Sequence, residues 1–299
     1  MSGQPYIVHI SHYFYGSAGT RVLHKLCHLL NQAGEKAFIY GEKTKTNPAW
    51  NTPTIPAARS RKLIAAGAIV VYPEVVSGNP LLAKTVVRYI LNNPGLLGGD
   101  KTYAASEILF CYVKPLLQPG MAPDRVLFIP AAATRLFYNN NQKRDIEYLV
   151  YFGKHKKVRG YPEKFTIYRH KPKTEVLADL LRRCKKLISY DNFTALTFEA
   201  TLCGCPVVII PDGSRKKEDL EENGFGLNGI AWGDSPEEFR KALRTLPQAA
   251  GRLKMLEAGA QTAIANFIAV TQTAAEKRKN DPMPARRRRG FFYSFFPRD

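Results

Sequence analysis

The chain has 299 residues, 45% apolar and 23% charged, so it is too long for a single small module and too apolar for a disordered chain. Its 44 Lys and Arg residues outnumber its 25 Asp and Glu residues, and the net charge of +19 favours an anionic partner such as nucleic acid, an anionic membrane surface or a phosphorylated substrate. The five cysteines form no CxxC pair, which argues against a zinc site or disulfide framework and predicts reduced, buried thiols.

The N-terminal residues lack the features of a targeting segment. Residues 1–4 are short and polar, and the first apolar run, at residues 6–10, has the length of a strand. The other apolar runs are well short of the roughly 20 residues that span a bilayer. We therefore expect a cytoplasmic protein whose contact with a membrane, if it has one, is peripheral.

The first part of the chain alternates between strand and helix patterns. A strand at 6–10, a glycine-containing loop, a helix at 21–32 and a strand at 37–40 form a βαβ unit, which implies a parallel sheet. An apolar strand follows at 68–72, then a helix predicted at 81–91 and short strands at 108–113 and 125–129.

A small and then polar segment between residues 130 and 147 has the composition of a domain linker, and we place the boundary near residue 140. Beyond it the alternation resumes, with strands predicted at 148–152, 164–168, 186–189 and 206–210 and helices at 174–184 and 194–203. The predicted fold class is α/β, with Rossmann-like doubly wound domains at 1–140 and 141–275 and a basic, aromatic tail at 276–299.

The segment 189–211, SYDNFTALTFEATLCGCPVVIIP, contains the best candidates for ligand binding. A strand ends before Asp191 and a helix begins near Thr194, where free backbone N–H groups and the helix dipole can bind a phosphate or diphosphate. Glu199 lies eight residues beyond Asp191, about two helical turns away, so the two carboxylates can hold both ends of one extended ligand.

This segment resembles the E-x7-E signature of GT-B sugar-nucleotide glycosyltransferases, followed by an EAxxxGxPVV pattern that reads EATLCGCPVV here. The resemblance implies that Glu199 binds the ribose hydroxyls and that Asp191, in the first acidic position, lies toward the donor sugar. The usual residue in that first position is Glu, so Asp191 has an arm shorter by one methylene. The signature also implies that transfer retains the anomeric configuration.

A second match lies upstream, where YFGKHKKVRGY resembles the family pattern G-[RK]-x4-[KR]-G. Gly153 begins the pattern, and Lys154 and Arg159 take its basic positions. Two cations across a departing diphosphate stabilise its growing charge without a metal, and the chain contains no DxD motif, so no metal cofactor is expected. The alternative interpretation is a solvated basic surface, since several lysines surround the two residues.

The N-terminal segment HISHYFYGSAGTRVLHKL resembles the first strand, glycine loop and helix of GT-B proteins. In that resemblance Gly16 allows the backbone to approach a donor or acceptor closely. His12, just past the strand end, and Glu74, after the apolar strand, are candidate catalytic residues because α/β proteins place ligands at that sheet edge. Glu74 can also be a hydrogen-bonded loop acid. Segment 70–95 resembles N-domain segments of bacterial cell-surface polysaccharide transferases, and segment 129–138 resembles the interdomain connection of GT-B proteins.

The tail combines four consecutive arginines at 286–289 with the aromatic sequence FFYSFF. Arginines are attracted to an anionic leaflet and aromatic rings settle at its interface, whereas on single-stranded nucleic acid they neutralise phosphates and stack on bases. We prefer an anionic membrane surface on the inner membrane face.

The sequence thus predicts a metal-independent glycosyltransferase that moves a sugar from a nucleotide-sugar donor to a glycan or lipid-linked saccharide acceptor in the synthesis of lipopolysaccharide, O-antigen or capsule. The alternatives are a glycosyltransferase acting on modified DNA bases and a non-catalytic nucleic-acid-binding protein.

Overall fold

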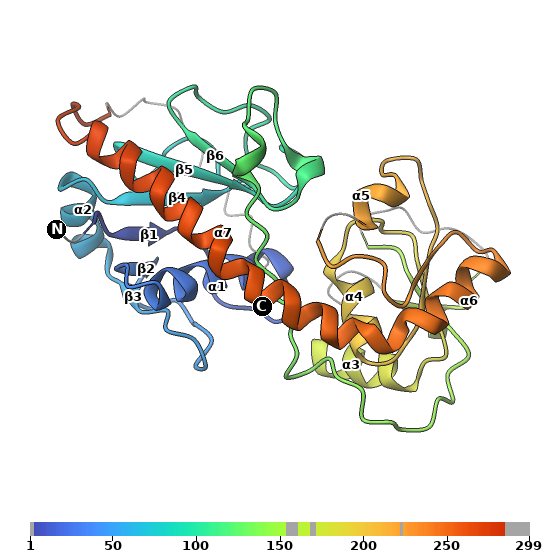
Figure 1. The fold of residues 1–299 in the computed structure, drawn as a ribbon. Coiled ribbons are helices and arrows are strands. Elements are labelled where there is room, and N and C mark those ends of the chain that lie inside the picture. Colours follow the sequence, from blue (N-terminus) through green and yellow to red (C-terminus); the bar gives the residue numbers. More distant parts are fainter. Residues whose placement is uncertain (1–2, 154–160, 168–171, 222–223, 285–299) are drawn as a thin grey trace. The chain divides into compact units, whose positions relative to one another are not determined.

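A computed structural model describes residues 3–153, 161–167, 172–221 and 224–284, and they form two compact units (Figure 1). Among these residues, unit 1 comprises 3–14, 19–129 and 259–284, and unit 2 comprises 15–18 and 130–258. The division at residue 130 falls ten residues before the predicted boundary. Residues 259–275, predicted to belong to the second domain, group with unit 1 instead.

Unit 1 contains a six-stranded parallel sheet with the strand order β3-β2-β1-β4-β5-β6, the order of the doubly wound dinucleotide-binding fold. Its strands are β1 (Tyr6–Val8), β2 (Ala37–Tyr40), β3 (Thr54–Ile55), β4 (Ile69–Pro73), β5 (Thr85–Ile90) and β6 (Ile108–Cys111). Its first helices are α1 (Ala18–Gln32) and α2 (Ala57–Ala65). The predicted fold class is therefore confirmed in this half.

The helix predicted at 81–91 is wrong, because residues 85–90 form the strand β5, buried at every position. The apolar spacing there fits a helix, but Val86, Val87 and Ile90 are β-branched, and strands buried on both faces read as continuous apolar runs. The strand predicted at 125–129 is also wrong, since the turn Pro123–Arg125 leaves only a single bridge between Val126 and Cys111.

Unit 2 contains a five-stranded parallel sheet with the order β11-β10-β9-β7-β8, which confirms the second doubly wound domain. Its strands are β7 (Leu149–Tyr151), β8 (Thr166–Ile167), β9 (Leu187–Ser189), β10 (Val207–Ile209) and β11 (Ile230–Trp232). Its helices are α3 (Thr174–Arg183), α4 (Ala195–Leu202), α5 (Lys217–Glu221) and α6 (Pro236–Thr245). The strand predicted at 164–168 is reduced to the two residues of β8, because Glu163–Phe165 form a 3-10 turn.

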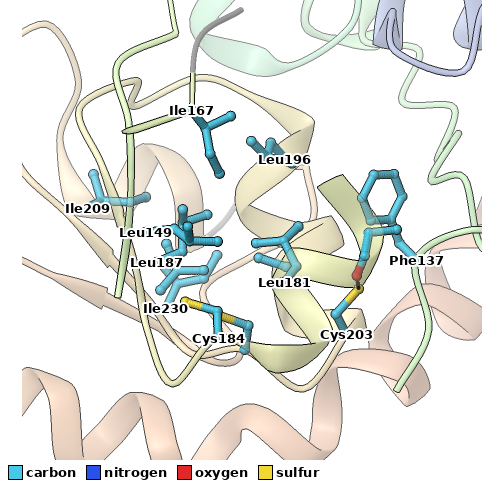
Figure 2. Close-up of a cluster of buried hydrophobic side chains, with 14 of the residues drawn as sticks. Phe137, Leu149, Ile167, Leu181, Cys184, Leu187, Leu196, Cys203, Ile209 and Ile230 are labelled. Carbon is cyan, nitrogen blue, oxygen red and sulfur yellow. Dashed lines mark hydrogen bonds between the residues drawn. The ribbon is translucent and has the colours of Figure 1, made fainter. Parts of the chain in front are cut away.

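One core cluster of unit 2 consists of aliphatic, cysteine and aromatic side chains from the strands, α3, α4 and the connecting segment (Figure 2). Leu149, Leu187 and Ile209 come from adjacent strands, and Leu181 and Leu196 come from the helices that cover them. All five cysteines of the chain are buried and free, as predicted.

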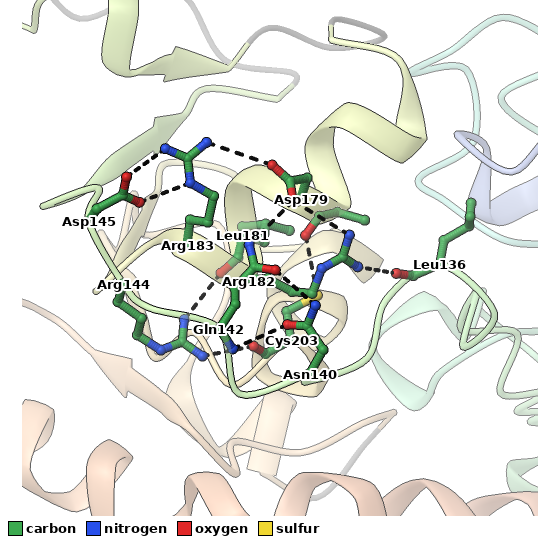
Figure 3. Close-up of polar contacts among 11 residues, drawn as sticks. Leu136, Asn140, Gln142, Arg144, Asp145, Asp179, Leu181, Arg182, Arg183 and Cys203 are labelled. Atoms are coloured by element: carbon green, nitrogen blue, oxygen red, sulfur yellow. Dashed lines mark hydrogen bonds and ion pairs between the residues drawn. The ribbon is translucent and has the colours of Figure 1, made fainter.

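The connecting segment 130–147 is fastened to unit 2 by arginines (Figure 3). Arg144 donates to the carbonyls of Leu181, Cys184 and Cys203 at 3.3, 2.6 and 2.9 Å. Arg182 donates to the carbonyl of Leu136 at 2.9 Å. The segment whose composition predicted a domain linker therefore binds the ends of α3 and α4.

The last helix, α7 (Ala249–Lys277), begins in unit 2 and ends in unit 1. In unit 2, Leu253 packs in one cluster with Phe198 of α4. In unit 1, the Phe267 ring lies 4.8 Å from that of Phe110, and the Thr271 hydroxyl is 2.8 Å from that of Tyr6 in β1. No helix in the described ranges is long and apolar enough to span a bilayer.

Candidate functional site

The candidate site of unit 2 lies where the strand order reverses, between β7 and β9. Open parallel sheets bind ligands in the crevice at the carboxyl ends of such strands. Gly153 follows β7 and Asp191 follows β9, so both predicted site residues lie at this edge. Gly153 has a φ of 58°, and a Cβ added to it would lie 2.3 Å from Oδ2 of Asp191. Only glycine therefore lets the two loops approach this closely.

Asp191 is fixed by its own loop. The residue is 2% exposed, and its Oδ1 accepts a hydrogen bond of 3.1 Å from the backbone N–H of Phe193. The Ser189 hydroxyl donates to the Asp191 carbonyl at 3.0 Å. The carboxylate is thus held in one orientation beside Gly153.

Thr194 is the N-cap of α4, as the sequence suggested. Its hydroxyl oxygen accepts from the N–H of Leu196 at 3.3 Å, and the Thr197 hydroxyl donates to the Thr194 carbonyl at 2.9 Å. Because the cap uses only one of the N–H groups in the first turn, the start of α4 remains suited to an anion.

Glu199 lies in the second turn of α4 and is 4% exposed. Its Oε1 accepts from the backbone N–H of Ala133 at 3.1 Å, so it holds the connecting segment against the helix. The sequence did not predict this structural contact. The ribose contact implied by the family resemblance stays a prediction.

Lys154 and Arg159 lie outside the described residues. A cation that the sequence analysis missed is Arg215, in the loop after β10, whose guanidinium carbon lies 5.0 Å from the centroid of the Phe193 ring. Burial lowers the pKa of Arg215, although the nearby Asp219 and Asp212 oppose the shift. Its position just after an apolar strand is the signal that could have identified it, because that edge of the sheet binds ligands.

Aromatic residues beside Gly153 were also missed. The Phe152 and Tyr190 rings stack with centroids 5.3 Å apart, and the Tyr190 hydroxyl lies 3.0 Å from that of Tyr161. This hydrogen bond is the main reason that the pKa of Tyr161 rises to about 12. Phe152 precedes Gly153 and Tyr190 precedes Asp191, so this aromatic stack packs beside the two loops of the site.

Unit 1 has a cavity of about 320 Å³ at the corresponding edge of its sheet. Here the strand order reverses between β1 and β4, and the lining residues come mainly from the chain that follows these two strands. They are His9, Ile10, Ser11, His12, Thr44, Pro73 and Val76. The predicted His12 therefore borders a cavity at the expected edge.

The loop after β1 is held by imidazoles. Nδ1 of His12 accepts from the backbone N–H of Lys45 at 2.9 Å, so a neutral His12 carries its proton on Nε2. Nε2 of His24 lies 3.0 Å from the Ser11 carbonyl. Burial lowers the pKa of His9, whose Nδ1 is buried without a hydrogen-bond partner. The cavity is thus bordered by at least one neutral imidazole.

Glu74 follows β4, but it is not among the residues that line this cavity. It is 4% exposed, and its Oε2 accepts from the N–H of Leu91 at 3.0 Å. Burial raises its pKa to about 7. These contacts match the alternative of a hydrogen-bonded loop acid, and catalysis by Glu74 remains an untested prediction.

Arg88 of β5 holds the loop that follows Glu74. It is fully buried, donates to the carbonyls of Pro73, Val76 and Gly78 at 3.3, 2.5 and 2.7 Å, and forms an ion pair of 2.9 Å with Glu107. A charge in the middle of a buried strand is tolerated only with such complete pairing.

The predicted site residues thus fall into two groups. Gly153, Asp191, Thr194 and Glu199 surround the start of α4 in unit 2, whereas His12 and Glu74 belong to the sheet edge of unit 1. Gly16 lies in a turn before α1 and groups with unit 2. Among the described residues, no three His, Cys, Asp or Glu side chains are grouped as a possible metal site.

No protein-family model matches the chain, and a search of curated proteins finds no match either. Among solved structures, similar chains include one described as a UDP-N-acetylglucosamine 2-epimerase from Listeria monocytogenes, with 11% identity, a TM-score of 0.44, and coverage of 93% of this chain and 98% of that one. WaaG, a glycosyltransferase involved in lipopolysaccharide biosynthesis, gives 13% identity, a TM-score of 0.39, and coverage of 92% and 98%. The structure of T4 phage BGT in complex with UDP and Mn²⁺ has 10% identity and a TM-score of 0.41, and the match covers 92% of this chain and 99% of that one.

Proposed function

We propose that the chain is a glycosyltransferase that takes a sugar from a nucleotide-sugar donor. The observation that carries the proposal is the grouping of Gly153, Asp191 and the capped start of α4 at the strand-order reversal of unit 2. These are the residues at which the sequence resembles the donor site of GT-B glycosyltransferases. Position in the fold and motif therefore support the same assignment.

The proposed chemistry follows from the charges. As the diphosphate leaves, negative charge grows on its oxygens, and the N–H groups at the start of α4, together with Lys154 and Arg159, stabilise that charge. Arg215 adds a positive charge at the same sheet edge. Asp191 faces the donor sugar and Glu199 the ribose, and no metal cofactor is required.

We propose unit 1 as the acceptor side, with the cavity beside His12 receiving an acceptor hydroxyl. A glycan or a lipid-linked saccharide of the cell surface is the acceptor class that the family resemblance favours. The basic and aromatic residues of 286–296, which lie outside the described residues, would bring the enzyme to an anionic membrane surface. A modified DNA base is the second candidate acceptor, and the net charge of +19 favours it.

The deciding experiment is a thermal-shift and calorimetric screen with UDP, GDP, ADP and CMP and their sugar conjugates. One conjugate should stabilise the chain selectively, by about 2.7 kcal/mol at 100 times its Kd. If no member of the panel binds, the proposal is wrong. Turnover of that donor should persist in a chelator, whereas loss of turnover would contradict metal independence.

The site variant for the same screen is Glu199→Gln, which keeps an oxygen for the Ala133 N–H but loses the charge. It should weaken donor binding by about 1.5 to 3 kcal/mol, the scale of a hydrogen bond to a charged group, while the melting temperature stays near wild type. Unchanged binding would leave Glu199 with a structural role only.

Two assays separate the acceptors. Removing residues 286–299 should abolish co-sedimentation with anionic vesicles without changing donor binding. If DNA is the acceptor, DNA binding should instead fall steeply as salt rises.

A further inference from the structure

The loop between β9 and α4 contains a polar side chain that none of the roles above uses. Asn192 follows Asp191 and is 3% exposed. Its Nδ2 donates to Oδ1 of Asp212, in the loop after β10, at 2.5 Å. Its own Oδ1 is buried and has no hydrogen-bond partner.

The orientation of this amide is fixed by its neighbour. Oδ1 of Asp212 also accepts from the N–H of Ser214 at 2.9 Å and from its hydroxyl at 2.6 Å. A carboxylate oxygen offers no proton, so the amide must turn its NH₂ group toward Asp212 and its oxygen away. The opposite orientation of the Asn192 amide, with oxygen and nitrogen exchanged, would place its Oδ1 against Oδ1 of Asp212. Both atoms are acceptors, so this orientation is unfavourable.

This buried oxygen is an unfavourable feature. A buried acceptor without a donor is destabilising, and native proteins keep few of them. This one lies one residue from Asp191, at the carboxyl edge where the donor site is proposed, and near the start of α4. The loop 211–214 beside it is exposed along its length, so a ligand reaches the amide by displacing exposed chain rather than core.

We propose that Asn192 is a specificity-determining residue whose Oδ1 accepts a hydrogen bond from an uncharged group of the bound nucleotide sugar, such as a hydroxyl. This inference rests on the proposed function. An amide oxygen can pair only with a donor, and the carboxylates of Asp191 and Asp212 on either side repel a phosphate. The phosphates therefore lie toward the helix start and Arg215, and the hydroxyl-bearing part of the ligand faces Asn192.

The test compares Asn192→Leu, which has a similar shape but no oxygen, with the double exchange Asn192→Asp plus Asp212→Asn. The exchange keeps an oxygen at position 192 and restores a hydrogen bond between the two side chains. Ser214→Ala is the matched control, because it removes another donor to Asp212 and leaves the Asn192 oxygen in place. Binding of UDP-glucose and of UDP is measured by calorimetry, with GDP-mannose and GDP as the second pair.

Asn192→Leu should weaken binding of the nucleotide sugar about tenfold. The affinity of the double exchange variant should lie within about threefold of wild type, and that of Ser214→Ala should lie within about twofold. If the nucleoside diphosphate alone binds normally to Asn192→Leu, the group that donates the hydrogen bond belongs to the transferred sugar. If the affinity for the nucleoside diphosphate falls by the same factor, the donor group belongs to the nucleoside. Either pattern supports the proposal.

Equal binding by Asn192→Leu and wild type overturns the inference and leaves the glycosyltransferase proposal standing. A loss in Ser214→Ala as large as that in Asn192→Leu overturns it too, because the effect then acts through the Asp212 loop. If Asn192→Leu does not fold, failure of the folded exchange variant to bind likewise overturns the inference. If the wild-type protein binds neither UDP-glucose and UDP nor GDP-mannose and GDP, the inference is overturned for both of these donors. The screen with the full nucleotide panel then tests the proposed function separately.

Discussion

Each unit uses one arginine to gather three backbone carbonyls, and the two arginines are in different environments. Arg88 of unit 1 is fully buried, forms an ion pair with Glu107, and lies 5.3 Å from the Tyr72 ring centroid. Arg144 of unit 2 is half-buried, and within the described residues it has no carboxylate partner (Figure 3). The arginine of unit 1 is thus a buried charge held by an ion pair, whereas that of unit 2 is a partly exposed charge held by backbone carbonyls.

The difference shows where each unit is vulnerable. A buried charge is stable only while all its partners remain, so removing one side of the Arg88 pair leaves an uncompensated charge. Arg144 is half-buried and forms no ion pair with a described carboxylate, so its removal leaves no unpaired charge behind, although the three residues whose carbonyls it binds are fully buried. The stability of unit 1 should therefore depend more strongly on Arg88 than that of unit 2 depends on Arg144.

The largest expected effect is that of Arg88→Met, which should lower the free energy of unfolding by about 3 to 5 kcal/mol because Glu107 and three carbonyls lose their donor. Urea unfolding followed by circular dichroism measures it. Arg144→Met should cost clearly less. Equal losses would contradict the distinction between the two arginines.

The partner variant sharpens this result. Arg88→Met combined with Glu107→Met removes both charges, and the double variant should be more stable than Arg88→Met alone. If the second substitution adds further destabilisation, the carboxylate of Glu107 has partners beyond Arg88.

A second expectation concerns pH and Glu74. Burial raises its pKa from 4.5 to about 7, so the native state keeps a proton that the unfolded chain has lost. Its contribution is fully present below pH 4.5 and is lost as the pH rises to about 7, at most roughly 3 kcal/mol. Glu74→Gln should flatten the stability profile between pH 5 and 8 and be the more stable protein at pH 8. An unchanged profile would show that Glu74 ionises normally.

In unit 2, Gly153→Ala should be destabilising and should abolish binding of the nucleotide sugar, because its Cβ would displace the Asp191 carboxylate. Gly78→Ala of unit 1 is the matched control. Gly78 has a φ of 59°, against 58° for Gly153, and a Cβ there meets nothing within 4 Å. The control carries only the backbone strain of about 1 to 2 kcal/mol. If both variants bind the donor equally, the fit between Gly153 and Asp191 does not shape the site.

The smallest effect is expected at the surface of unit 2. Arg183 and Asp145 form an ion pair of 2.6 Å, and both side chains are well exposed (Figure 3). Exposed pairs contribute little because water and salt screen them. Arg183→Met should leave the urea midpoint unchanged in about 0.5 M salt, and a clear decrease would show that exposure does not govern these arginines.

The sequence was informative where the signal was local. Near Asp191 the elements are close together in the sequence: the strand before it, the cap at Thr194 and the start of the helix that follows lie within a dozen residues. Their order can therefore be read directly from the sequence. Gly153 was predicted from a separate upstream pattern, and its contact with Asp191 became apparent only from the pairing of β7 with β9.

The failures have a common cause in partners that are distant in the sequence. β5 was mistaken for a helix because its apolar spacing also fits a helix. The partners that allow Arg88 to be buried in a strand, Glu107 and the loop after β4, are not visible in any local pattern. The place of Phe267 in unit 1 depends on Phe110, more than 150 residues earlier. Asn192 was missed because its free oxygen is apparent only once Asp212 is placed.

The contacts of β1 with α7 have a consequence for synthesis on the ribosome. Tyr6 in β1 pairs with Thr271, and Gln4 with Gln272, so unit 1 is completed by residues translated some 260 positions after its first strand. Unit 2 is nearly continuous from residue 130 to 258 and can fold while the part of α7 that belongs to unit 1, from residue 259 on, is still in the exit tunnel. During that interval the Tyr6 side of β1 lacks its contact with α7. We therefore expect the nascent N-terminal half to bind chaperones.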